Sequence, residues 1–297
     1  MDLLQSCVLC PRKCGANRKN GEVGYCGMPD KPVVARAAPH NWEEPCISGS
    51  RGSGTVFFSG CSLGCCFCQN YKISRELKGK QIGVNRLAEI FLELQSKGVH
   101  NINLVTPSHF SPQIIQALDI ARERGLNLPV IYNSSGYDRV ETIRSLESYV
   151  DVFLPDFKYF SPQLSKRYSA CDDYFECASK ALEEMVGQVG SPCFKDGLIK
   201  KGVIVRHLLL PGCLEDSKRV IKYLSDNFKD RVFISIMSQY TPIVRQTVNT
   251  ELNRRVSAVE YNELVEYAVS LGIENGFVQE EQAADESFIP DFSCEGI

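Results

Sequence analysis

Six short apolar segments alternate with helical patterns along the middle of this 297-residue chain. Strands are predicted at residues 55–58, 102–105, 130–132, 152–154, 203–210 and 232–236. Continuously apolar strands are typical of parallel sheets buried on both faces, and the segments between them are long enough for right-handed helical crossovers. The fold class is therefore α/β, and six such units fit an open partial barrel or a doubly wound sheet.

Composition divides the chain into three parts. Residues 1–54 are rich in Cys, Gly, Pro and basic residues and show little periodicity, so we expect a cysteine-rich, loop-dominated N-terminal segment. Residues 55–245 contain the six predicted strands, and residues 246–297 are expected to form a helix and strand extension packed on them. A capping box from Ser257 to Glu260 marks the start of the last helix.

Charge and hydropathy exclude two classes of partner. The net charge of -3 leaves no basic excess that would favour nucleic acid. The sequence has no apolar run long enough to span a bilayer, and its first residues lack the pattern of a signal peptide. We therefore expect a cytoplasmic protein that binds neither nucleic acid nor membranes.

The cysteines are concentrated near the start, with nine of the 14 between Cys7 and Cys68. Disulfides do not persist in a reducing compartment, so this local enrichment indicates metal ligation or redox chemistry. Cys61, Cys65 and Cys68 are spaced C-x3-C-x2-C in the loop after the first predicted strand. Three thiolates on one loop suit an iron-sulfur cluster that keeps one iron without a protein ligand, and we expect Cys66 to be a spectator.

With Phe67 as its aromatic residue, this C-x3-C-x-aromatic-C motif resembles the signature of the radical S-adenosylmethionine (radical SAM) superfamily. The resemblance implies a partial (β/α)6 barrel, a 4Fe-4S cluster on Cys61, Cys65 and Cys68, and S-adenosylmethionine (SAM) bound at the open iron. Reductive cleavage of SAM would generate a 5'-deoxyadenosyl radical. The whole chain resembles a cysteine-rich branch of the proteins related to pyruvate formate-lyase activating enzyme.

Segments at the ends of later strands carry the same resemblance. The segment NSSG implies that Asn133 and Ser135 contact the cofactor, and DFK implies the same for Asp156 and Lys158. Arg206 matches the strand arginine that the resemblance assigns to the SAM carboxylate.

The residues themselves leave alternatives to two of these assignments. Asp156 and Lys158 fall on the same face of a strand end and could simply neutralise each other. Arg206 lies within an apolar strand, where a buried guanidinium needs a carboxylate from either another part of the chain or a ligand. His207 faces away from Arg206, and we expect it to be a packing residue.

Two segments depart from the pattern of the family. In place of Gly-Gly-Glu after the second strand, this chain has TPSH. Pro107 lacks an amide hydrogen, so a carbonyl, Thr106 or Ser108 would have to replace that contact, and His109 is a candidate to reach the substrate. After the last strand, Gln239 is the expected cofactor contact where activating enzymes carry a histidine.

A second group of cysteines, spaced C-x2-C-x3-C-x11-C, precedes the first strand. These residues are Cys7, Cys10, Cys14 and Cys26. Four sulfurs favour a closed site for zinc or an accessory iron-sulfur cluster, and partial ligation or none is the alternative.

The leading hypothesis is a radical SAM enzyme that removes hydrogen from a C–H bond. The resemblance favours a glycine of a partner protein as its substrate and a flavodoxin or ferredoxin as its electron donor. A small molecule or another protein side chain is an alternative substrate. A non-catalytic iron-sulfur or zinc protein is the alternative from another class.

Overall fold

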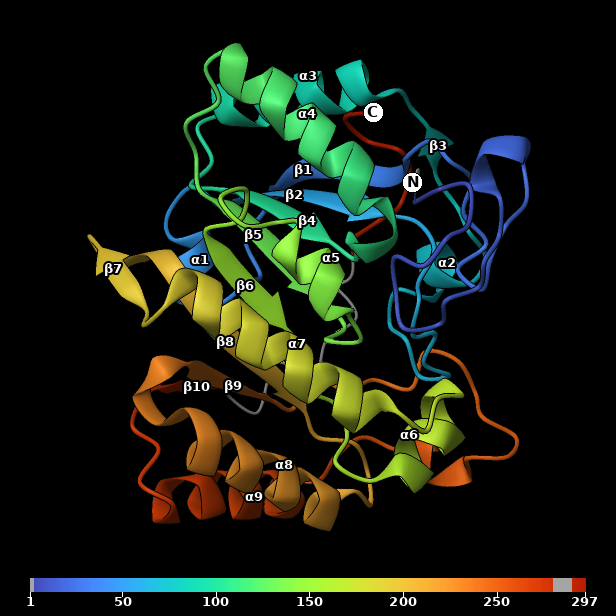
Figure 1. Ribbon diagram of the computed structural model, residues 1–297. Helices are drawn as coiled ribbons and strands as arrows, with labels where there is room; N and C mark the ends of the chain where they lie inside the picture. Colours follow the sequence, from blue (N-terminus) through green and yellow to red (C-terminus); the bar gives the residue numbers. More distant parts are fainter. Residues whose placement is uncertain (1–2, 280–289) are drawn as a thin grey trace.

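The computed structural model describes residues 3–279 and 290–297, and its centre is an open, mostly parallel sheet (Figure 1). Its described strands run in the order β10-β9-β8-β6-β5-β4-β2-β1-β3, and β7 pairs with β8. The six predicted strands are β2 (Ser53–Phe58), β4 (Ile102–Val105), β5 (Val130–Ser134), β6 (Val152–Pro155), β8 (Leu198–Leu208) and β9 (Phe233–Met237). Neighbours among these six are parallel, which confirms the prediction of a partial α/β barrel.

Helices cover the outer face of this sheet (Figure 1). They include α3 (Val84–Ser96), α4 (Ser111–Glu123), α5 (Val140–Arg144), α6 (Pro162–Ser169), α7 (Tyr174–Val189), α8 (Leu214–Phe228) and α9 (Ala258–Ser270). Each of the long crossover helices buries one apolar face; in α3, for example, Leu87, Ile90 and Leu94 are buried. Because the six strands are parallel and each crossover helix returns the chain to the start of the next strand, the carboxyl ends of all six lie on the same side.

The N-terminal segment contains more regular structure than we predicted. β1 (Val33–His40) pairs antiparallel with β2 and with the short β3 (Lys80–Gln81). Its sequence, VVARAAPH, lacks an alternating pattern because all but three of its residues are at least nine-tenths buried.

The helix predicted near residues 138–148 is shorter in the structure than expected, since α5 ends at Arg144 and turns follow it.

Short elements complete the fold around these layers. They are η1 (Arg18–Asn20), α1 (Pro45–Ser48), α2 (Tyr71–Ser74), η2 (Ser108–Phe110), β7 (Cys193–Lys195), η3 (Lys229–Arg231), η4 (Thr250–Asn253) and β10 (Gly276–Val278). β10 extends the sheet parallel to β9. Residues 294–295 make backbone hydrogen bonds to Ala35 and Ala37, so the C-terminus covers part of β1.

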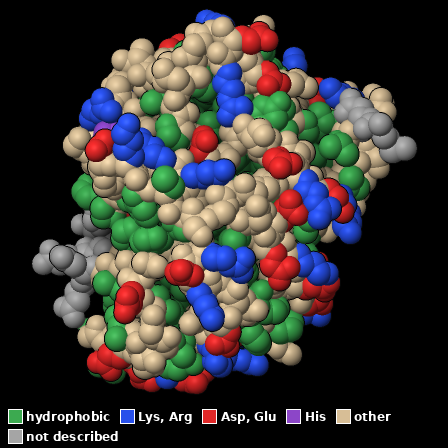
Figure 2. Space-filling view, turned by 60° about the vertical axis from the view of Figure 1, so that its left-hand side comes forward, with side chains coloured by type: hydrophobic (Ala, Val, Ile, Leu, Met, Phe, Trp, Pro, Cys, Tyr) green, Lys and Arg blue, Asp and Glu red, His purple; other side chains and the backbone are tan. Residues whose placement is uncertain are grey.

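Acidic and basic side chains are interspersed over the face of the molecule that Figure 2 shows. None of the described helices is both long and apolar enough to cross a bilayer.

The predicted capping box of α9 is present. The Ser257 hydroxyl accepts a hydrogen bond from the Glu260 amide, and the Glu260 carboxylate accepts one from the Ser257 amide.

Substitution Ser257→Ala removes the capping hydroxyl from α9 and is expected to lower the free energy of unfolding by about 1 kcal/mol. Urea denaturation followed by circular dichroism measures this change. Ser270→Ala in the last turn of the same helix is the matched control and should change stability by less than about 0.5 kcal/mol. An equal effect of the two substitutions would contradict the role of the cap.

Candidate functional site

One cavity opens at the carboxyl ends of the strands and gathers every residue predicted to bind the cluster or the cofactor. Its empty volume is about 1400 Å³, including the open mouth. The predicted residues in its wall are Cys61, Cys65, Cys68, Asn133, Ser135, Asp156, Lys158, Arg206 and Gln239. These residues come from the ends of four strands and from the cysteine loop that follows β2, so the parallel topology brings them together.

The cysteine loop follows β2 directly and directs three of its four sulfurs to this cavity. Cys66 is not in the cavity wall; its sulfur accepts a hydrogen bond from Asn249 Nδ2 at 3.6 Å. The Cys65 sulfur accepts a hydrogen bond from the Ser169 hydroxyl at 3.1 Å, and the Cys68 sulfur accepts one from Ser74 at 3.3 Å. The geometry therefore agrees with the prediction that Cys66 is a spectator.

Burial dominates the chemistry of these thiols. It raises the pKa of Cys68 to about 12, with smaller contributions from Cys65 and Cys61. It also raises the pKa of Cys65, although the positive charge of Lys158 opposes that shift. Without a cation Cys65 and Cys68 hold their protons, and metal binding has to release them.

Asp156 and Lys158 form an ion pair in the cavity wall, with Lys158 Nζ 2.6 Å from the Asp156 carboxylate. Burial alone would lower the pKa of Lys158, but Asp156 and the adjacent Cys65 raise it overall. Lys158 is therefore charged. The two side chains therefore neutralise each other, which was one of the two interpretations of the sequence. Both also line the cavity, which the other interpretation, a contact with the cofactor, requires.

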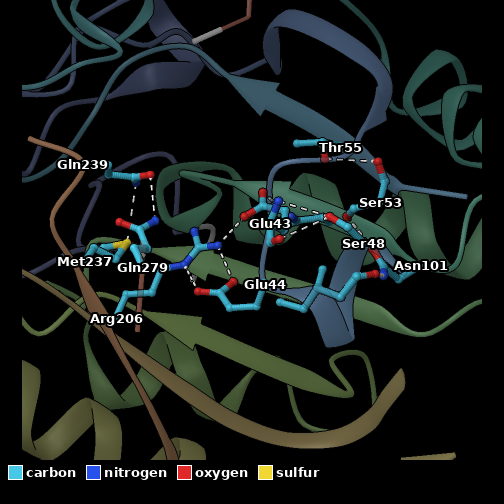
Figure 3. Close-up of polar contacts among 12 residues, drawn as sticks. Glu43, Glu44, Ser48, Ser53, Thr55, Asn101, Arg206, Met237, Gln239 and Gln279 are labelled. Atoms are coloured by element: carbon cyan, nitrogen blue, oxygen red, sulfur yellow. Dashed lines mark hydrogen bonds and ion pairs between the residues drawn. The ribbon is translucent and has the colours of Figure 1, made fainter. Parts of the chain in front are cut away.

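Arg206 lies in the cavity wall and points toward two glutamates (Figure 3). Its Nε is 2.8 Å from Glu44 Oε1, and its Nη2 contacts both Glu44 and Glu43. The exposed fraction of these side chains is only 14% for Arg206, 7% for Glu43 and 6% for Glu44. An internal carboxylate therefore meets the buried guanidinium, which was one of the two alternatives; a contact between Arg206 and the SAM carboxylate stays a prediction.

Glu43 and Glu44 are the site residues that sequence reasoning missed. They precede α1 at the amino-terminal ends of the strands, and Glu43 also accepts a hydrogen bond from Asn103 Nδ2 at 2.8 Å (Figure 3). Burial would raise the pKa of Glu44, but Arg206 lowers it overall. The sequence contains one signal that could have indicated them: two adjacent glutamates directly before Pro45. Arg206, predicted to be buried in a strand, needed carboxylate partners of this kind.

The buried carboxyl of Asp138 links the loops that follow β4 and β5. It accepts hydrogen bonds from Ser108 at 2.5 Å, Ser134 at 2.6 Å and Tyr132 at 3.2 Å. Burial raises the pKa of Asp138, although the serine hydroxyls oppose this shift. Ser108 is thus engaged outside the cavity, whereas Thr106 lies in the cavity wall and remains the candidate to replace the missing Gly-Gly-Glu contact.

The structure corrects the expectation for one histidine and agrees with the other. His109 is buried, and its Nε2 donates to the Ser59 carbonyl at 2.7 Å. Because His109 is not in the cavity wall, the expectation that it reaches the substrate is wrong. His207 donates from Nδ1 to the Phe157 carbonyl at 2.7 Å, as expected of a packing residue. Burial lowers the pKa of His109 to about 3 and that of His207 to about 4, so both are neutral.

Gln239 lies in the cavity wall after β9. Its side-chain carbonyl accepts a hydrogen bond from Gln279 Nε2 at 3.1 Å, and Figure 3 shows the two amides facing each other. Gly136 supports the opposite wall, because its φ of +73° and a distance of only 2.1 Å from an added Cβ to the Asp156 carbonyl exclude any side chain there.

The N-terminal cysteines lie near one another outside this cavity. Cys7, Cys10 and Cys26 are buried, and Cys14 is exposed. Burial, with smaller contributions from the other three thiols, raises the pKa of Cys10 to about 12. The Cys14 sulfur accepts a hydrogen bond from the Tyr25 amide at 3.2 Å, an arrangement that would also stabilise a thiolate.

A protein-family model described as the radical SAM superfamily matches residues 55–242. The chain belongs to the radical SAM superfamily. The family match covers the six parallel strands and the cysteine loop, and it implies an enzyme with a 4Fe-4S cluster and SAM as cofactors.

The individual proteins that this chain is similar to are distant from it. An uncharacterized protein of Methanocaldococcus jannaschii, MJ0674, is 27% identical over 275 residues, which are 90% of this chain and 75% of that protein. Methylornithine synthase (PylB) has a TM-score of 0.51 at 15% identity, over 90% of this chain and 67% of its own. SuiB of Streptococcus suis, solved with S-adenosylmethionine, has a TM-score of 0.52 at 14% identity, over 75% of this chain and 49% of its own. The two structures share the fold.

The residues present fit the cofactors that the radical SAM fold implies. Among the described residues, no three His, Cys, Asp or Glu side chains are placed to share a single metal ion. A cluster binds its cysteines at separate irons, so its three thiolates need not converge on one ion. The Thr241 hydroxyl in the cavity wall is buried and has no hydrogen-bond partner within the described parts of the chain, which suits a wall that meets a polar ligand.

Substitution Arg206→Met leaves Glu43 and Glu44 buried without their cation and is expected to cost about 3–5 kcal/mol of stability at pH 7.5. In the native protein the pKa of Glu44 is lowered, so its stabilising contribution is present above its ordinary pKa and is lost as the pH falls. In the variant, burial without the opposing charge of Arg206 raises the pKa of Glu44. The deficit should therefore shrink between pH 7.5 and pH 5.

Chemical denaturation at both pH values measures this deficit. The double variant Arg206→Met with Glu44→Gln removes one of the unpaired charges and should recover part of the stability at pH 7.5. A deficit that is independent of pH, or that grows in acid, would show that the ion pairs do not stabilise the barrel.

Proposed function

We propose that this radical SAM enzyme abstracts hydrogen from a glycine of a partner protein, as activating enzymes for glycyl radical enzymes do. The observation that supports the chemistry is the single cavity that contains three thiols and six predicted cofactor residues. Support for a polypeptide substrate comes from the sequence resemblance to activating-enzyme-related proteins. In addition, SuiB, which shares the fold at a TM-score of 0.51, has been solved with its precursor peptide SuiA bound.

Cys61, Cys65 and Cys68 would hold the cluster, and the bound SAM would supply a carbon-centred radical after one-electron reduction. Asn133 and Ser135 would orient the cofactor from one wall of the cavity. Lys158, charged and close to Cys65, would stabilise the negative charge of the thiolates.

Three further residues of the cavity wall would complete the cofactor site. Asp156 and Gln239 present an anionic and an amide group to the cavity, and Arg206 also lies in its wall. Because the carboxylates of Glu43 and Glu44 already engage Nε and Nη2 of Arg206, we propose that this arginine acts mainly by closing the barrel and leaves only the two N–H groups of Nη1 for the cofactor.

A flavodoxin or ferredoxin in the cytoplasm is the proposed electron donor. Arg12, Tyr25 and Arg75 surround the outer side of the cysteine loop, so a donor would approach across a surface that includes basic side chains. Such a surface favours acidic partners.

We also propose that Cys7, Cys10, Cys14 and Cys26 hold a second metal group, either zinc or an accessory cluster. Zinc would require these sulfurs to move together on binding, because no three of the described ligand side chains converge on one ion. Around these residues the structure describes a small apolar cluster of Leu4, Cys7 and Leu9 and one short 3-10 helix, η1, while Cys26 and Met28 reach the main core. A metal held by four thiolates would stabilise loops that have so small a core.

Cys65→Ala is expected to abolish formation of 5'-deoxyadenosine, because it removes one of three cluster ligands. The anaerobically reconstituted protein is mixed with SAM and dithionite, and the product is measured by chromatography. Cys66→Ala is the matched control and should keep at least about half of the wild-type rate, since its sulfur lies outside the cavity. A larger loss in the Cys66 variant than in the Cys65 variant would overturn the ligand assignment.

If the four N-terminal cysteines bind a metal, that metal should remain when the cluster at Cys61, Cys65 and Cys68 is removed. A variant with Cys61, Cys65 and Cys68 changed to Ala should still contain stoichiometric zinc or iron by mass spectrometry of the metals. A further Cys10→Ser change should abolish that residual metal, whereas Cys193→Ser, an exposed cysteine on β7, should not. The absence of residual metal from the first variant would contradict the proposal.

A further inference from the structure

The N-terminal segment lies against the carboxyl ends of the strands (Figure 1). Arg12 makes most of the side-chain hydrogen bonds that this segment donates to the cysteine loop. The Arg12 guanidinium donates to the carbonyls of Ser62 at 3.0 Å and Leu63 at 3.1 Å. It also donates to the carbonyls of Ser169 at 2.9 Å and Ala170 at 2.6 Å. One planar cation thus joins the cysteine loop to the end of α6.

Tyr25 fixes the position of this guanidinium. The tyrosine ring lies 4.0 Å from the Arg12 Cζ, a distance typical of a cation–π contact. Its hydroxyl donates to the Leu63 carbonyl at 3.4 Å and accepts a hydrogen bond from Arg75 Nη2 at 3.2 Å. Arg75 also donates to the Gly64 carbonyl.

The consequence is that all three carbonyls between Cys61 and Cys65 have side-chain donors. The carbonyls of Ser62, Leu63 and Gly64 belong to a loop without strand or helix partners, so these bonds define its shape. The spacing of the two cysteine sulfurs follows from that shape.

Arg12 also affects the second element that contacts the cysteines. The backbone at Ser169 accepts from Arg12, while the Ser169 hydroxyl donates to the Cys65 sulfur. In the same region the Cys66 amide donates to the Tyr168 carbonyl at 2.8 Å. Loss of Arg12 would therefore loosen both the loop that carries the thiols and the donor that stabilises one of them.

We propose that Arg12 is a positioning residue for the cluster: it holds the Cys61–Cys65 loop and the end of α6 as one unit. This inference rests on the proposed cluster at Cys61, Cys65 and Cys68. It gives the N-terminal segment a specific function, because Arg12 lies between Cys10 and Cys14 and a metal at those cysteines would fix its place. Lysine cannot substitute, since its single ammonium cannot reach four carbonyls in a planar fork.

Hydrogen-exchange mass spectrometry on the full chain before reconstitution tests the proposal without depending on the cluster. In Arg12→Gln, amides of residues 61–66 and 168–171 should exchange about tenfold faster or more, because several charge-assisted bonds are lost, while the strands keep their protection. Arg12→Lys should behave like Arg12→Gln. Lys13→Gln, an exposed neighbour with the same change in charge, should behave like the wild type.

The reconstituted variants provide a second measurement. Arg12→Gln and Arg12→Lys should lose iron to a chelator several-fold faster than the wild type and show an altered electron paramagnetic resonance spectrum of the reduced cluster. Unchanged exchange in 61–66, faster exchange throughout the chain, or full recovery in Arg12→Lys would overturn the proposal. If the wild type itself takes up no iron, the proposed function fails, and the exchange data still decide the role of Arg12.

Discussion

Three thiols that one loop directs into the same cavity are the constraint on which the rest of this structure depends. Burial favours the protonated form of Cys65 and Cys68, so these sulfurs are poor ligands until a cationic group replaces their protons. Lys158 and the hydroxyls of Ser169 and Ser74 offset part of that cost because they lie next to the sulfurs. The loop is therefore arranged for thiolates that a cluster of iron and sulfide would neutralise.

The parts of the chain that precede the first parallel strand contact the barrel at both ends of its strands. Arg12 covers the cysteine loop at the carboxyl ends of the strands, and Glu43 and Glu44 meet Arg206 from the amino-terminal side. Both contacts place an arginine against acceptors that are held by other elements, either backbone carbonyls or buried carboxylates. The segment described by composition as loop-dominated is thus a structural component of the site.

Much of the fold and of the cavity could be predicted from the sequence because both follow from local patterns. Apolar strands and crossover helices determine a parallel sheet, and a parallel sheet places Asn133, Asp156 and the cysteine loop at one edge. The partners of Arg206 could not be predicted, since Glu43 and Glu44 lie far away in sequence and no local pattern links them. β1 was missed for a related reason: it has no alternation and exists because it pairs with β2.

The central claim is that Cys61, Cys65 and Cys68 leave one iron of the cluster open for SAM. Electron-nuclear double resonance of the reduced protein, with SAM labelled by 15N in its amino group and 17O in its carboxylate, tests this claim directly. The account predicts hyperfine coupling of both labels to the cluster. Coupling from neither label, together with a fourth protein ligand at the cluster, would contradict it.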